Sequence, residues 1–94
     1  MKQINGTDLI KEYVRTSLEI RLKDWDGKEA ISFKGISAAD LHPILEDFGF
    51  SIDEDSLDLN GWEGDYWLRV KYNDVIYTLG GSFYYGTHSI YKED

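Results

Sequence analysis

Apolar and polar residues alternate along this chain with two periods, that of a helix near the start and that of a strand in the second half. Residues 5–17 repeat their apolar positions at helical spacing. Thr7 is a suitable N-cap, and Asp8 follows in the first turn, where the helix dipole favours an anion. The pattern predicts a first helix whose buried stripe is Leu9, Ile10, Tyr13 and Val14.

The next segment, residues 18–34, predicts a β-hairpin. Apolar and charged residues alternate with a period of two up to Lys23, and Asp26-Gly27 favours a two-residue turn because both residues accept positive φ. A turn there opposes apolar to apolar residues on one face and an acid to a base on the other. The predicted cross-strand pairs are Leu22–Ile31, Ile20–Phe33 and Glu19–Lys34.

A second helix is predicted over residues 36–50. Ser37 followed by Asp40 resembles a capping box, and Gly49 is a typical stop. Pro43 fits in one of two ways: the helix begins at Asp40, with Pro43 in its first turn, or it is kinked at Pro43. The predicted buried stripe is Leu41, Ile44, Leu45 and Phe48.

From residue 56 onwards the alternation predicts antiparallel strands. The predicted turns and bends lie at Asn73-Asp74, at Gly80-Gly81 (a bulge or bend) and at Gly86-Thr87 (a type II′ turn). The predicted apolar pairs are Leu68 with Leu79, Val70 with Tyr77, and Phe83 with Ile90. The whole chain, residues 1–94, is therefore expected to be one α+β domain with two short helices and an antiparallel sheet. Its order is α-ββ-α followed by four or five strands.

Composition narrows the class of protein. A chain of 94 residues, 41% of them hydrophobic, can bury a core as one domain. The absence of cysteine removes disulfides and thiolate metal sites, and it predicts an intracellular protein. The first residues lack the apolar run of a signal peptide, and no run reaches the ~18 apolar residues of a membrane span. We therefore expect a cytoplasmic protein with no membrane partner.

Charge is distributed very unevenly along the chain. The net charge is −8, which disfavours direct binding to nucleic acid or to an anionic membrane. Residues 36–68 contain nine acids and no base, while the two flanking segments are almost neutral. Solubility needs only interspersed charges. A concentrated negative field, by contrast, attracts and orients a basic partner.

The acidic segment therefore predicts a binding surface for a basic protein, in particular a nucleic-acid-binding enzyme. Nine carboxylates correspond to about 15 Å of duplex DNA at one charge per ~1.7 Å, and Trp62 supplies an apolar anchor. Two other interpretations stay open: the segment is merely solvated, or it is a weak cation site. The predicted partner-binding residues are Glu46, Asp47, Asp53, Glu54, Asp55, Asp58, Trp62, Glu63 and Asp65.

The motifs of cofactor binding and catalysis are not matched. A calcium loop that begins at Asp53 or Asp58 has the wrong residues at its glycine and final glutamate positions. The segment GSFYYGT has the glycines of a phosphate loop but no lysine. His42 and His88 lack metal-ligand spacing, and we expect His88 on a surface hairpin beside Tyr85. We expect no cofactor, no metal site and no enzymatic activity.

The predicted strands offer a second candidate surface. Five residues alternate with the core pairs and therefore share the opposite face of the sheet: Trp67, Arg69, Lys71, Ile76 and Thr78. If the helices cover only one face, this aromatic and basic face is open to a protein partner or to a second copy of the chain. The alternative is that the first helix packs against it.

The C-terminal stretch GWEGDYWLRVKYNDVIYTLGGSFYYG, in an acidic and cysteine-free chain, resembles the small proteins of phages and mobile elements in Gram-positive bacteria. Such proteins include anti-CRISPR and anti-restriction inhibitors, some of which fill a nuclease's nucleic-acid channel with carboxylates. The resemblance implies an inhibitor of a CRISPR effector or another defence nuclease in a bacterial host's cytoplasm. It carries over no individual residue. The alternative is an immunity or regulatory protein that neutralises a toxin or enzyme through the exposed sheet face.

Overall fold

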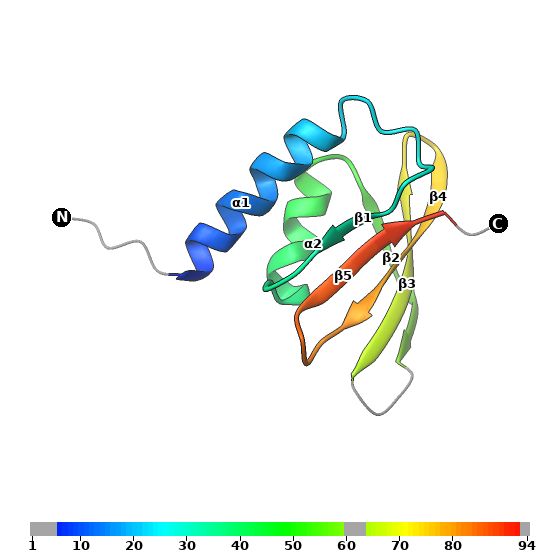
Figure 1. Ribbon diagram of the computed structural model, residues 1–94. Helices are drawn as coiled ribbons and strands as arrows, with labels where there is room; N and C mark the ends of the chain where they lie inside the picture. The colour runs from blue at the N-terminus through cyan, green and yellow to red at the C-terminus, as the bar shows by residue number, and fades with distance from the viewer. Residues whose placement is uncertain (1–5, 60–63, 93–94) are drawn as a thin grey trace.

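The computed structural model describes residues 6–59 and 64–92. These residues form two helices and five strands (Figure 1). The helices are α1 (Gly6–Arg21) and α2 (Ala38–Asp47), and the strands are β1 (Ile31–Phe33), β2 (Ser51–Leu59), β3 (Asp65–Tyr72), β4 (Val75–Ser82) and β5 (Thr87–Tyr91). The predicted α+β class, with two helices and an antiparallel sheet, is confirmed.

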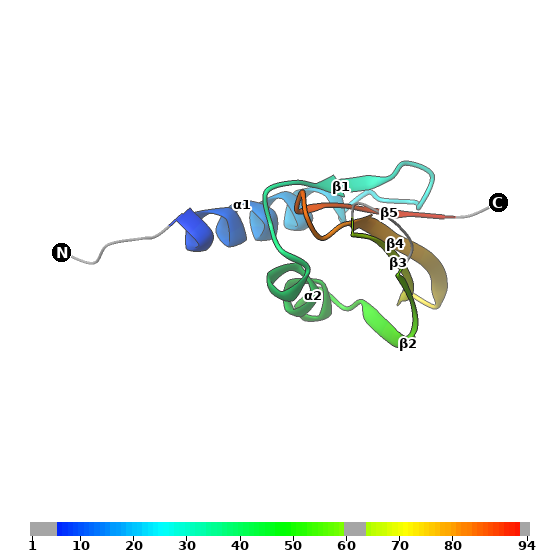
Figure 2. The same ribbon diagram turned by 90° about the horizontal axis from the view of Figure 1, so that it is seen from below.

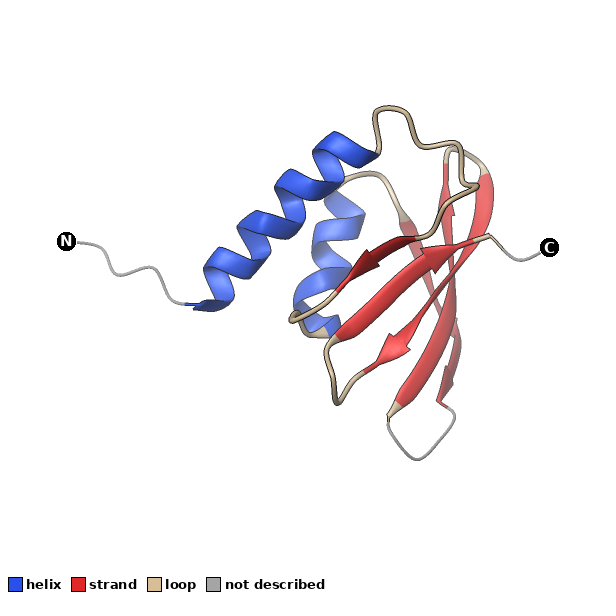
Figure 3. Ribbon diagram, viewed as in Figure 1, coloured by secondary structure: helices blue, strands red, loops and turns tan. Residues whose placement is uncertain are grey.

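The strands form one antiparallel sheet in the order β1-β5-β4-β3-β2. The sheet curves around α2, so that α2 lies inside the curve (Figure 2). The two helices lie next to one another, and strands β2, β3 and β4 lie beyond them (Figure 3). The long edge strand β2 and the three-residue strand β1 form the two edges of the sheet.

The first helix is longer than predicted, and the hairpin predicted over residues 18–34 is wrong. Residues 18–21 complete α1, and β1 pairs with β5 instead. Leu18 lies four residues from both Val14 and Leu22, so it continues the helical stripe as well as the strand-like alternation. Burial decides between the two, because Leu18 is fully buried and Ile20 is 65% exposed. The cross-strand pairs predicted for residues 19–22 therefore do not form.

The buried side of α1 also differs from the predicted stripe. Val14 and Leu18 are buried and Ile10 is half-buried, at a spacing of four residues. Leu9 and Tyr13, which the sequence pattern assigns to the core, are exposed. The helix therefore keeps only part of its apolar surface in the core.

Helix capping follows the sequence prediction at α2 but not at α1. Ser37 is the N-cap of α2, and its side-chain oxygen accepts a hydrogen bond from the Asp40 backbone N–H at 3.2 Å. Thr7 lies inside α1, which begins at Gly6, and so it does not cap the helix. Asp8 lies in the first turn, as predicted.

Helix α2 runs from Ala38 to Asp47 with Pro43 inside it, so the predicted start at Asp40 is wrong. Proline cannot donate the hydrogen bond of its turn. Helix α2 forms despite this missing hydrogen bond, and its side chains Leu41, Ile44 and Leu45 are buried. The helix ends at Asp47, and the predicted stop Gly49 lies two residues further on, where its φ of +101° allows the Phe50 N–H to donate to the Leu45 carbonyl at 3.0 Å.

The β3–β4 hairpin is confirmed in its turn and in its register. Leu68 pairs with Leu79 and Val70 with Tyr77. Asn73 and Asp74 have φ angles of +50° and +64°, the positive pair that a type I′ turn requires.

The β4–β5 connection differs from the prediction in two ways. Of the two alternatives predicted for Gly80-Gly81, a bulge or a bend, the bulge is wrong, because the register continues through both residues. A Cβ at Gly81 would lie 1.9 Å from the Thr87 carbonyl oxygen, so glycine here permits the close approach of β5. The turn is also longer than predicted: Ser82 pairs with Thr87 across residues 83–86, and the predicted pair of Phe83 with Ile90 does not form.

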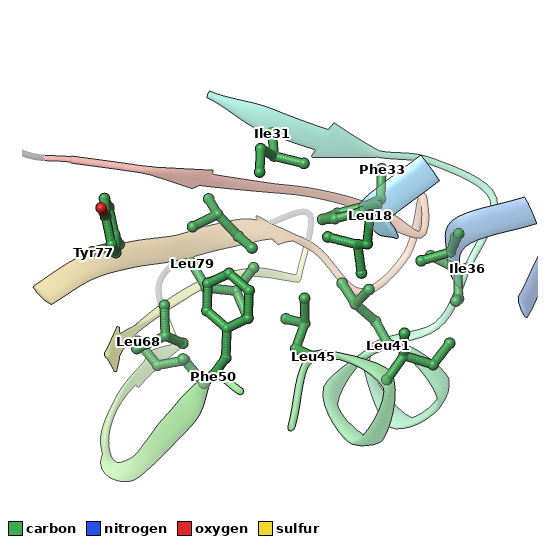
Figure 4. Packing of buried hydrophobic residues seen from close by; sticks show 14 of the residues in the cluster. Leu18, Ile31, Phe33, Ile36, Leu41, Leu45, Phe50, Leu68, Tyr77 and Leu79 are labelled. Atoms are coloured by element: carbon green, nitrogen blue, oxygen red, sulfur yellow. The ribbon is translucent and has the colours of Figure 1, made fainter. Parts of the chain in front are cut away.

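The core lies between the inner face of the sheet and the two helices. Figure 4 shows Leu18 from α1 and Leu41 and Leu45 from α2 directed towards side chains of the sheet, among them Leu79. Trp25, in the connection between α1 and β1, closes the far end of this core. Its ring lies 4.6 Å from that of Tyr77, and its Nε1–H donates to the Glu29 carbonyl at 2.7 Å.

Candidate functional site

The predicted acidic residues follow the edge strand β2 and the segments on either side of it. Glu46 and Asp47 are the last residues of α2, and Asp65 is the first of β3. Trp62 and Glu63 lie outside the described residues. Four more carboxylates project from β2, and all seven described side chains are exposed; the four are Asp53, Glu54, Asp55 and Asp58.

Strand β2 departs from regular pairing in the middle of its acidic run. It begins at Ser51, five residues before the start that the sequence pattern indicates. Asp53 and Asp58 pair with residues of β3 only two positions apart, so the residues between them form a bulge. Ser56 anchors the bulge: its hydroxyl donates to the Asp53 carbonyl at 2.6 Å and accepts from the Arg69 backbone N–H at 2.7 Å. A fixed hydrogen-bonded geometry therefore presents the acids of the bulge.

The carboxylates of β2 face both sides of the sheet edge. Asp53 is in register with Arg69, which projects from the outer face. Glu54 lies near His42 of α2, on the helix side. Burial and the neighbouring His88 lower the pKa of His42, and the charges of Glu46 and Glu54 oppose that shift. The acids therefore form a ridge along the edge rather than a patch on one face.

Ion pairs neutralise little of this ridge. Asp47 lies 3.9 Å from Arg15, and Asp40, further back on α2, lies 3.5 Å from Lys11. Within residues 6–59 and 64–92, no lysine or arginine nitrogen lies within 4.0 Å of the β2 carboxylates, Glu46 or Asp65. Arg69, opposite Asp53, is the cross-strand cation of β3 nearest in register to the ridge. The negative field of the ridge is therefore directed mainly at solvent.

The outer face of the sheet is open, as one of the two sequence interpretations requires. Trp67 is 37% and Ile76 57% exposed, and Arg69 and Lys71 are exposed as well. Thr78 is nearly buried between its strand neighbours. The alternative, in which α1 packs on this face, is wrong.

A shallow hollow of about 550 Å³ lies on this outer face, between the β2 bulge and β4. Ser56 and Asp58 line one side of it, and Trp67, Ile76 and Thr78 line the other. The hollow therefore joins apolar surface to one of the ridge carboxylates.

His88 is buried, which contradicts its predicted place on a surface hairpin beside Tyr85. It is 2% exposed and uses both ring nitrogens: Nε2–H donates to the Ile36 carbonyl at 2.7 Å, and Nδ1 accepts from the Tyr66 hydroxyl at 2.5 Å. This assignment follows from the carbonyl, which can only accept. Burial lowers the pKa of His88 and raises that of Tyr66, so both are neutral at pH 7. The pair clamps β3, β5 and the β1–α2 connection, and its burial keeps substrate away.

His42 stands beside this clamp and has a different environment. Its ring centroid lies 6.2 Å from that of Tyr66, and its buried Nε2 has no hydrogen-bond partner in the described part of the chain.

Among the described residues, no three of the types His, Cys, Asp and Glu are grouped so as to hold a metal ion. No helix in residues 6–59 or 64–92 has the length and apolar character to cross a membrane.

Comparison of the chain with protein-family models, with curated proteins and with solved structures finds no match. The interpretation of the candidate site therefore depends on its geometry alone.

Sequence reasoning missed two of its features, the bulge anchored by Ser56 and the Tyr66–His88 clamp. The alternation of β5 carries a signal for the second, because His88 lies two residues from the core residue Ile90 and so shares its face.

Proposed function

We propose that this protein is a non-enzymatic inhibitor that occupies the nucleic-acid site of a basic protein with the carboxylates of its β2 ridge. The observation that carries the proposal is that all seven described acids between Glu46 and Asp65 are exposed, in a stretch of sequence that contains no lysine or arginine. Among its described members only Asp47 makes an ion pair. The partner class that fits is a CRISPR effector or another defence nuclease in a bacterial cytoplasm.

The spacing of the ridge supports this function. A β-strand advances about 3.3 Å per residue, and one strand of B-DNA presents a phosphate about every 3.4 Å along its axis. Successive side chains of a strand point to opposite sides, so acids that share one side are about 6.6 Å apart, close to the axial spacing of every second phosphate. The acids of an edge strand can therefore meet Lys and Arg side chains that normally contact phosphates. The ridge lies at the rim of the molecule, where a concave partner surface can reach it.

Acids on an edge strand also have a purely structural use, because charge on such a strand blocks edge-to-edge pairing between molecules. The two roles differ in their response to charge reversal. Lysine protects an edge as well as glutamate does, whereas a basic partner repels it. Charge reversal therefore separates inhibition from protection against aggregation.

The test compares two double variants of equal net charge. Glu54→Lys/Asp55→Lys reverses the ridge, and the control Asp24→Lys/Glu29→Lys reverses two exposed acids in the α1–β1 connection. Each variant changes the net charge from −8 to −4. The readout is DNA cleavage by purified CRISPR effectors and restriction nucleases in the presence of each protein.

We expect inhibition by the wild type and the control, and its loss in the ridge variant. Inhibition should also weaken steeply as salt rises. Equal inhibition by both variants would contradict the proposal.

A second candidate function uses the open outer face of the sheet. In it the protein is an immunity or regulatory protein that neutralises a toxin or enzyme, with Trp67 and Ile76 as apolar contacts. The exposure of these two side chains favours it. Trp67→Ser/Ile76→Ser would then abolish partner binding, and the ridge reversal would not.

A further inference from the structure

Helix α1 carries a second apolar stripe that faces away from the core. Leu9, Tyr13 and Ile20 are 57%, 75% and 65% exposed, and the exposed Thr16 lies between them. Their spacing of four, three and four residues places all four side chains within an arc of about 60° on a helix. At 1.5 Å per residue the stripe is about 16 Å long. We call Leu9, Tyr13, Thr16 and Ile20 the outer stripe.

The outer stripe is separate from the surface with which α1 packs. Val14 and Leu18 face the core, while Lys11 and Arg15 pair with Asp40 and Asp47 of α2. Helix α2 therefore lies on the Lys11–Arg15 side, roughly 150° around the helix from the outer stripe. Figure 2 shows the first half of α1 extending beyond the sheet. No described element covers the stripe.

A helix that packs on one side of a small domain needs one apolar stripe, with polar residues elsewhere. Single exposed apolar residues are ordinary, but a contiguous row of them marks an interaction site. The row on α1 has the spacing with which an amphipathic helix contacts a partner helix.

Charge beside the outer stripe identifies the kind of partner. Glu12 and Glu19 lie along one flank of it, the first between Leu9 and Tyr13 in sequence and the second between Thr16 and Ile20. Both are exposed, and neither makes an ion pair within the described residues. In an antiparallel pair of α1 helices, Glu12 would face Glu19 of the second copy, and these like charges repel. A partner with Lys or Arg beside its apolar row would instead be attracted.

The other flank of the outer stripe is hollow. A groove of about 420 Å³ lies between α1 and the strands. Tyr13, Ser17 and Arg21 line it on the helix side, and Ser32, Lys34 and Ser89 line it on the strand side. This flank therefore carries cations, whereas the flank of Glu12 and Glu19 carries acids. The groove provides room for the side chains of a helix lying along α1.

We propose that the outer stripe of α1 is a docking surface for an amphipathic helix of another protein, with apolar residues at its centre and Lys or Arg on the flank that meets Glu12 and Glu19. This surface is distinct from the β2 ridge, and the proposal does not rest on the inhibitory function. It predicts a helix-to-helix contact in which Glu12 and Glu19 meet the partner's cations.

The test titrates the full chain into two labelled synthetic helical peptides and follows fluorescence anisotropy. Both peptides carry leucine at the contact positions; on the flank that meets Glu12 and Glu19, one has lysine and the other glutamate. Leu9→Gln/Ile20→Gln removes the outer stripe. Its matched control is Leu57→Gln/Leu59→Gln, in which the two side chains are 43% and 65% exposed on β2.

We expect the lysine peptide to bind, and the stripe variant to weaken this binding at least about tenfold, since two apolar side chains lose their contacts. The control should bind like the wild type. Glu12→Gln/Glu19→Gln should remove the preference for lysine over glutamate, and Glu54→Gln/Asp55→Asn should retain it. The Glu54→Gln/Asp55→Asn variant separates this surface from the ridge, because inhibition by the ridge can fail while the outer stripe still binds the lysine peptide.

Four results would overturn the proposal. The first is no binding of the lysine peptide at about 1 mM, and the second is equal weakening of its binding by the stripe variant and its control. The third is a dimer in sedimentation that the stripe variant abolishes. The fourth is stripe-dependent binding to phosphatidylcholine or phosphatidylglycerol vesicles in place of the peptide.

Discussion

Strand β4 is paired on both sides and buries Tyr77, Thr78 and Leu79, whereas β2 is paired on one side and buries none of its nine residues. Packing therefore constrains the side chains of β4, whereas in β2 the half-buried Ile52 packs against the core and Ser56 anchors the bulge. A strand with so few core contacts can carry a dense row of charge without disturbing the core. We therefore expect substitutions in β4 and its neighbours to change the stability of the fold, and substitutions in β2 to change binding to a partner.

The largest effect on stability should come from the centre of β4. Leu79 is fully buried, and Leu79→Ala removes its contacts and leaves a cavity, so we expect the free energy of unfolding to fall by about 2–5 kcal/mol. Urea denaturation followed by tryptophan fluorescence measures this. The same substitution on β2, Leu59→Ala, affects a side chain that is 65% exposed and should change stability by at most about 0.5 kcal/mol. Similar losses in the two variants would refute the contrast.

Breaking the buried clamp should have the next largest effect. His88→Phe keeps a ring of similar shape but leaves the Tyr66 hydroxyl and the Ile36 carbonyl without their buried partner. We expect a loss of about 2–4 kcal/mol in the free energy of unfolding. Tyr66→Phe removes only one of the two hydrogen bonds and should cost less. An unchanged midpoint in urea for His88→Phe would show that the clamp contributes nothing.

Acid should weaken the same region. Burial holds the pKa of His88 and of His42 below the usual value of about 6.5, so the unfolded chain binds protons more readily than the folded one. Stability is therefore fully present above about pH 6.5 and falls as pH drops below it. Thermal unfolding from pH 7.5 to 5 should show this fall, and His88→Gln should reduce its slope. A wild-type midpoint that rises on acidification would contradict the assignment of a neutral, buried His88.

The smallest effect on stability should come from the ridge. Glu54→Gln/Asp55→Asn removes two like charges that lack ion-pair partners in the described chain, so the free energy of unfolding should stay within about 0.5 kcal/mol or rise slightly. Added salt should reduce any difference from the wild type by screening. A loss above about 1 kcal/mol would show that these acids support the fold, and β2 would then resemble β4.

The sequence predicts the β3–β4 hairpin fully because two independent signals agree there. The alternation on either side of Asn73-Asp74 sets one register, and both turn residues accept positive φ. Residues 18–22 fail for the opposite reason. Their period of two also fits a helical spacing of four from Val14 through Leu18 to Leu22, and only the tertiary packing of Leu18 distinguishes the two.

The site was predictable in composition but not in geometry. The absence of bases between Glu46 and Asp65 is visible in the sequence. The bulge is not, because it depends on Ser56 bridging Asp53 and the backbone of Arg69 across two strands. The outer stripe of α1 was hidden as well: Leu9 and Tyr13 have the residue types of a core, and exposure alone identifies them as surface.

The most direct test of the proposed inhibition is mutual exclusion with DNA. For a nuclease that this protein inhibits, the dissociation constant of the protein is measured by surface plasmon resonance while unlabelled duplex DNA is increased. If the β2 ridge occupies the phosphate-binding site, the apparent dissociation constant should rise linearly with the concentration of free DNA, and Glu54→Lys/Asp55→Lys should not bind even without DNA. An affinity that saturating DNA leaves unchanged would show that the carboxylates of β2 do not take the place of phosphates.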